Sequence, residues 1–82
     1  MAREIFHIVQ AFKAGRGARL IAEQPIRCRS SDAARTRAEG LATTRAGVVA
    51  FITSGDAEVG EYDEQPTILF RAGRLPPPFD ET

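Results

Sequence analysis

The sequence is poor in the residue types that build most catalytic and metal sites. It has no tryptophan, one tyrosine, one histidine and one cysteine among its 82 residues. A lone cysteine excludes an intramolecular disulfide, and one histidine with one cysteine does not supply a zinc-ligand set. No apolar run approaches the roughly 18 residues of a transmembrane helix, and no signal-peptide pattern opens the chain. We therefore expect a cytoplasmic protein that needs no cofactor or metal and enters no membrane.

The length of the chain predicts one small domain, and its charge is segregated along the sequence. We assign residues 1–74 to a single α+β domain and residues 75–82 to a proline-rich C-terminal tail. The formal net charge is zero, but residues 1–45 carry nine Arg or Lys against four Asp or Glu, and residues 46–82 carry two against seven. Ten of the eleven basic residues are arginine, which suits carboxylate or phosphate recognition but also reflects composition bias.

Residues 31–45 are the one stretch with convincing helical character. Ser31 is expected to cap the first turn, Arg45 to lie in the last turn, and Gly47 to end the helix. The apolar positions recur at helical spacing and are almost all alanine: Ala34, Ala38, Leu41, Ala42 and Ala46. A helix this short is marginal alone, so we expect this alanine stripe to pack closely against another surface.

Four segments favour β-strands because they are rich in β-branched and aromatic residues. They are residues 5–12, residues 19–22 with a continuation after Pro25 at residues 26–28, residues 48–53 and residues 67–72. A glycine-rich turn joins the first two as a hairpin. The acidic connection of residues 54–66 is expected to be a loop.

The resulting ββαββ order predicts an α+β fold. A helix that returns the chain makes the third strand antiparallel to the first. The simplest arrangement is a four-stranded antiparallel sheet of order 2-1-3-4, with one helix packed on one face. The two most apolar strands, residues 5–12 and 48–53, then lie in the middle of the sheet.

Both faces of these central strands are apolar, and one helix covers only one face. A large exposed apolar patch is rare on a monomer, and symmetric dimers are the commonest oligomers. We therefore predict a homodimer that self-associates through its sheet, using a face drawn from Phe6, Ile8, Phe12, Val49 and Phe51. Two alternatives stay open, namely cover by Leu75 and Phe79 of the tail, and cover by another protein or a ligand.

Nucleic-acid binding is the alternative function. The arginines expected to contact phosphates lie in the first hairpin and the helix: Arg16, Arg19, Arg35 and Arg37. The zero net charge and the lack of an evident aromatic stacking platform make this alternative the less favoured one.

No catalytic activity is expected. The acidic cluster that starts at Asp56 begins like a calcium loop, but the sixth loop position is Glu61, and the glycine stands one place early. The only conceivable nucleophile–base pair is Cys28 with His7, which lie on paired strands of the first hairpin. We interpret both residues as structural.

Four stretches carry a resemblance to known sequences: IVQAF in the first strand, the glycine-rich turn, the alanine–arginine helix before AGVVAF, and SGDAEVGEYDEQPTILFRAG. On these stretches the whole chain resembles a small family of uncharacterised hypothetical proteins from alphaproteobacteria. This resemblance implies no function. The resemblance implies a bacterial origin, whereas the residues themselves predict a protein–protein interaction module without catalysis.

Overall fold

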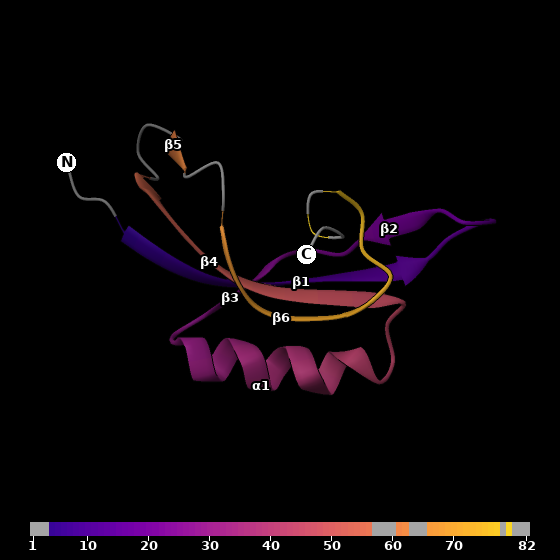
Figure 1. Ribbon diagram of the computed structural model, residues 1–82, viewed down its shortest axis with the longest axis horizontal. Coiled ribbons are helices and arrows are strands. Elements are labelled where there is room, and N and C mark those ends of the chain that lie inside the picture. The colour runs from indigo at the N-terminus through magenta and orange to yellow at the C-terminus, as the bar shows by residue number, and fades with distance from the viewer. Residues whose placement is uncertain (1–3, 57–60, 63–65, 78, 80–82) are drawn as a thin grey trace.

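The computed structural model describes residues 4–56, 61–62, 66–77 and 79. Its elements are β1 (Glu4–Ala14), β2 (Leu20–Ala22), β3 (Ile26–Cys28), α1 (Ser31–Ala42), β4 (Gly47–Asp56), β5 (Glu61–Tyr62) and β6 (Thr67–Gly73). The strands form one antiparallel sheet, and α1 lies along one side of it (Figure 1). The predicted α+β class, with one helix in the described part of the chain and an antiparallel sheet, is confirmed.

The predicted count of four strands is wrong, and the strand order differs in detail. The order along the sheet is β2-β1-β4-β5, with β3 also paired to β1 and β6 also paired to β4. The predicted second strand is thus two short strands, β2 and β3, which both pair with β1. Pro25 lies between them, where its missing N–H cannot contribute to the sheet.

The register of β1 against β4 sorts the central side chains into two faces, because residues directly opposite in antiparallel strands share a face. The side that packs on α1, which we call the helix face, carries Val9, Ala11, Val48 and Ala50. The opposite side, which we call the open face, carries Phe6, Ile8, Gln10, Phe12, Val49 and Phe51. The helix therefore covers the face with the smaller side chains.

A β-bulge in β6 changes which of its side chains reach the open face. Ala50 pairs with Phe70, whereas Phe51 pairs with Ile68, so Leu69 is an extra residue in the ladder. Leu69 packs toward the helix-face core. Ile68 consequently lies on the open face, although Phe70, two residues further along, lies on the helix face.

The core lies between α1 and the helix face of the sheet. Its buried members are small: Val9, Ala11, Ala34, Ala38, Val48 and Ala50. Ala34 and Ala38 have no exposed surface, as expected for a helix that approaches a sheet closely through its smallest side chains. Leu41 and Ala42 are half-buried at the margin of this core. The predicted stripe is confirmed from Ala34 to Ala42, whereas Ala46 lies beyond the end of the helix.

The helix ends differ from the predicted ones. Ser30, not Ser31, is the N-cap, and its extended backbone lets Oγ accept a hydrogen bond from the Ala33 N–H at 3.1 Å. The helix ends at Ala42, with Thr43 as its C-cap. Arg45 therefore lies beyond the last turn, and Gly47 is the first residue of β4.

Part of the predicted acidic loop is sheet. Strand β4 continues to Asp56, and β5 pairs with its last two residues. The extension persists because β1 still pairs with this part of β4, from Glu4 opposite Gly55 onward. Residues 57–60 and 63–65, which include Glu58, Asp63 and Glu64 of the acidic cluster, lie outside the described residues.

Candidate functional site

The open face is the part of the molecule that sequence reasoning singled out, and its five predicted residues do share one side of the sheet. Ile8 stands directly opposite Phe51, and Phe6, Phe12 and Val49 follow the same alternation. They differ in exposure, however. Phe6, Phe12 and Val49 are buried within one chain, whereas Ile8 and Phe51 are half-buried.

Cover at one end of the open face comes from β3. Arg27 stands opposite Ile8 in the register, and its guanidinium carbon lies 4.5 Å from the centroid of the Phe6 ring. An arginine over an aromatic face contributes cation–π attraction of about 0.5–1 kcal/mol at an exposed site. The apolar stem of Arg27 also shields the ring from water. The burial of Phe6 is therefore explained by contacts within one chain.

The link after β2 is held to the sheet by Gln10, which stands on the open face. Its Nε2 atom donates to the main-chain carbonyls of Glu23 and Ala11. The Glu23 N–H returns a hydrogen bond to the Ala11 carbonyl at 2.9 Å. These bonds pair the main chain where Pro25 interrupts the strand, so the hairpin stays closed against β1.

The tail folds back over the same face. The ring of Phe79 stacks on the ring of Phe51, with centroids 5.3 Å apart and an interplanar angle of 27°. The Arg71 Nη1 atom donates to the Phe79 carbonyl at 3.0 Å. A turn closed by the Phe79 N–H on the Pro76 carbonyl returns the chain toward the sheet. Figure 1 shows this segment on the side of the sheet opposite α1.

This placement bears on one of the open alternatives, which was cover by the tail, and Phe79 provides it over Phe51. Consecutive prolines favour an extended polyproline form, but the Phe79 N–H closes a turn on the Pro76 carbonyl instead. This turn accompanies the contacts of Phe79 with Phe51 and Arg71.

A pocket of about 310 Å³ lies between the tail and strand β6. Its lining residues are Arg71, Ala72, Gly73, Leu75 and Phe79. The wall is therefore made of one cation, one aromatic ring, an aliphatic side chain and the end of a strand. Two of these residues, Leu75 and Phe79, belong to the tail, so the tail itself forms part of the wall.

The tail leaves part of the open face exposed. Ile8, Phe51 and Ile68 form a row across β1, β4 and β6, and Ile68 is 39% exposed. We call these three residues the apolar row. Sequence reasoning missed Ile68 and Arg71, because simple alternation along β6 does not reveal the bulge at Leu69. No signal in the sequence marks that bulge.

The arginines proposed for nucleic-acid contact occupy two separate parts of the fold. Arg16 and Arg19 lie in the turn between β1 and β2, whose N–H and carbonyl groups bond to each other. Arg35 and Arg37 are exposed on α1. The helix contacts β1, β3, β4 and β6, and β2 is not among its neighbours. The structure therefore does not bring the four arginines together by packing.

Cys28 and His7 are direct cross-strand partners in the register of β3 against β1. Both are half-buried on the helix face, and Cys28 packs against the core. Within the described residues, no group of three or more His, Cys, Asp or Glu side chains is placed to hold a metal ion. The pair fits a structural role beneath α1, and the expectation that the protein is not an enzyme stays a prediction.

Comparisons with known proteins found no matching family model, curated protein or solved structure. The resemblance to alphaproteobacterial proteins therefore stays a prediction. Over the described part of the chain, no helix has the length and apolar character needed to span a membrane.

Proposed function

We propose that this chain is a small, non-catalytic interaction module of the cytoplasm that self-associates through its sheet. The observation that carries the proposal is the apolar row of Ile8, Phe51 and Ile68, which crosses three adjacent strands and stays partly exposed. Solvent-facing apolar side chains that lie next to one another mark an interaction surface more often than scattered ones do.

A second copy of the chain fits this surface better than a partner of strong charge. The apolar row has no charged member, and the two arginines beside it, Arg27 and Arg71, contact the Phe6 ring and the Phe79 carbonyl. The formal net charge of the chain is zero. Two copies therefore meet without net electrostatic repulsion. A row of apolar side chains can pack on its own copy about a two-fold axis, which is the symmetry of most homodimers.

Burial by the chain itself narrows the interface that the sequence predicted. Because Phe6, Phe12 and Val49 are already buried, the contact is expected to centre on Ile8, Phe51 and Ile68. Such a small apolar centre predicts a weak dimer rather than an obligate one, since stable interfaces bury roughly 1,200–2,000 Å² in total.

Size-exclusion chromatography with light scattering across micromolar to millimolar concentrations tests the proposal. Ile68→Ser is expected to shift the monomer–dimer equilibrium toward monomer by about tenfold, because it removes an exposed apolar side chain from the contact. Ile5→Ser is the matched control, since Ile5 is 63% exposed but follows the alternation of the helix face.

Two results would contradict the proposal. One is a wild-type chain that stays monomeric over the whole concentration range. The other is an Ile5→Ser variant that weakens self-association as much as Ile68→Ser does, because apolar exposure alone, and not the open face, would then explain the effect.

A further inference from the structure

The contacts between the tail and the open face have the character of a peptide in a groove. One aromatic side chain, Phe79, stacks on Phe51, and its own carbonyl accepts a hydrogen bond from Arg71. Leu75 lines the pocket beside them. A side chain that fills a site while a main-chain group is fixed by a hydrogen bond is the way that short peptide segments are recognised.

We propose that this groove is a peptide-binding site for a proline–phenylalanine segment, and that in the self-associated form it takes the tail of a second copy. In this arrangement each chain places its Phe79 on the partner's Phe51. The inference rests on the proposed function, because it needs two chains to meet at the open face. Beyond the proposed function, the inference names the segment that binds in the groove and so joins the two chains.

Two of these contacts, the stack of Phe79 on Phe51 and the bond from Arg71 to the Phe79 carbonyl, can form between chains as well as within one chain. The stack of Phe79 on Phe51 and the bond from Arg71 depend on the groove and the segment, not on which chain supplies the segment. Exchange of an identical element is a low-cost route to a dimer for this reason. The exchanged form also brings two copies of the apolar row near each other.

The chain has a defined point from which the tail departs. Gly73 has φ +74°, and the following Arg74 N–H donates to the Ala46 carbonyl at 2.9 Å. Arg74 also donates from its Nη2 atom to the Ala18 carbonyl at 2.7 Å. These bonds hold the end of β6 in place, so the tail departs from a fixed point at Leu75.

The closed monomer competes with exchange. A tail joined to its own groove by a link of a few residues stays close to that groove, which favours the closed form. Exchange is therefore expected to grow with protein concentration and to be weak in dilute solution. This expectation agrees with the weak dimer that the small apolar row predicts.

A complementation experiment tests the proposal on the full-length chain. Phe79→Ala has a defective segment and an intact groove, whereas Phe51→Leu keeps apolar volume in the groove but loses the ring. Sedimentation of each variant alone is expected to show self-association weakened by about tenfold. An equimolar mixture, with one variant fluorescently labelled, is expected to form a mixed dimer more readily than either variant self-associates, since one intact pair is restored.

A second measurement addresses the groove without reference to dimerisation. A labelled peptide of residues 75–82 is expected to bind the Phe79→Ala chain, whose groove lacks its own ring, and to bind the wild-type chain at least about tenfold more weakly. The same peptide with alanine in place of its phenylalanine is the control. Circular dichroism and thermal unfolding establish that each variant is folded before either measurement.

The outcomes separate the two proposals. If Phe79→Ala self-associates as tightly as wild type, exchange is overturned while self-association through the sheet stands. If wild type is monomeric, exchange and the proposed function both fail, and peptide binding to Phe79→Ala then supports the groove alone. If the peptide does not bind the folded Phe79→Ala chain, or binds its alanine form equally well, the groove is overturned.

Discussion

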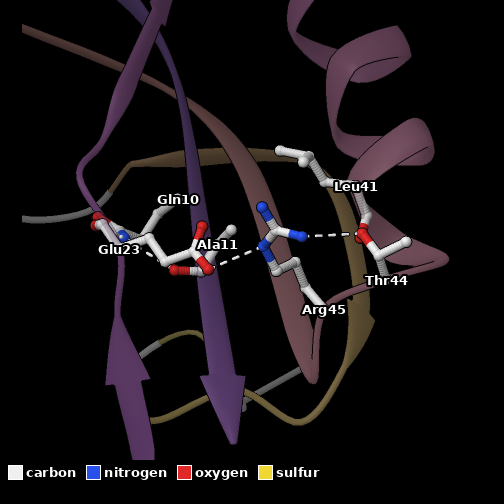
Figure 2. A network of polar contacts seen from close by, with 6 residues as sticks. All are labelled: Gln10, Ala11, Glu23, Leu41, Thr44 and Arg45. Atoms are coloured by element: carbon white, nitrogen blue, oxygen red, sulfur yellow. Dashed lines mark hydrogen bonds and ion pairs between the residues drawn. The ribbon is translucent and has the colours of Figure 1, made fainter.

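The Nε atom of Arg45 lies 2.8 Å from Oε2 of Glu23, which joins the segment after α1 to the link between β2 and β3. Figure 2 shows Arg45 between Glu23 on one side and Thr44 on the other, with Gln10 holding the Glu23 main chain. The two side chains form an ion pair, but the buried Nε atom of Arg45 makes no hydrogen bond. Two segments far apart in the sequence are thereby fixed on one end of the sheet.

Glu23→Gln is expected to lower the free energy of unfolding by about 1 kcal/mol, because the side chains of this pair are only partly exposed and the Arg45 Nε atom loses its counter-charge. Urea denaturation measures the change. The difference from wild type is expected to shrink at high salt, since salt screens the pair. Glu39→Gln, at an exposed position on α1, is the control. Equal effects of the two substitutions would contradict a specific role for the ion pair.

Gly47→Ala is expected to destabilise the fold by about 1–3 kcal/mol or more, because overpacking forces the backbone to move. A Cβ atom at Gly47 would lie 1.7 Å from the Arg74 carbonyl oxygen, which is main chain and cannot rotate away. Gly40→Ala is the matched substitution, since a Cβ atom there meets nothing within 4 Å.

The Gly40→Ala chain is expected to gain about 0.5–1 kcal/mol from helix propensity. Thermal unfolding of both variants measures the two changes. Tolerance of Gly47→Ala would show that the close approach between the start of β4 and the end of β6 is misplaced. Loss of stability in Gly40→Ala would show that the open space at this helix position is misassigned.

The helix cap supplies the third prediction. Ser30→Ala is expected to cost about 0.5–2 kcal/mol, because the Ala33 N–H loses its side-chain acceptor. Ser31→Ala, one residue along, is expected to be nearly neutral, since Ser31 is already helical and alanine has the higher helix propensity. Chemical denaturation of the two variants distinguishes them. The opposite ranking would restore Ser31 as the cap.

The central pair of strands and the alanine stripe of the helix were predictable because each depends on a local pattern. Residues 5–12 and 48–53 are apolar at nearly every position, which places them at the centre of a sheet. Ala34 and Ala38 recur at helical spacing, and both are buried against the sheet. The grouping of Phe6, Ile8 and Phe12 on one face follows from the two-residue period of a strand, whereas the register of β1 against β4 places Phe51 with them.

The helix ends and the strand count were less predictable, because neighbouring residues offer equivalent local choices. Ser30 and Ser31 are both good caps, and the backbone at residue 30 decides between them. Arg45 suited the last turn of a helix, but it forms an ion pair with Glu23 instead. The continuation of β4 to Asp56 depends on its pairing with β1, which no local pattern in the acidic segment indicates.

The candidate site was predicted only in part for the same reason. The open face followed from strand alternation, but its cover did not, because Arg27 and Phe79 reach it from separate parts of the chain. Ile68 lies on the open face because β6 contains one extra residue, and no sequence pattern indicates the position of this β-bulge.

The sequence by itself determined the class of fold, the central strands and the helix, because side-chain periodicity and propensity act over a few residues. The tertiary structure alone decided which face the helix covers, how far Phe79 closes the other face, and that Ile8, Phe51 and Ile68 remain as a row. These features arise from contacts between residues that are distant in the chain, whose energies depend on the complete arrangement of the strands.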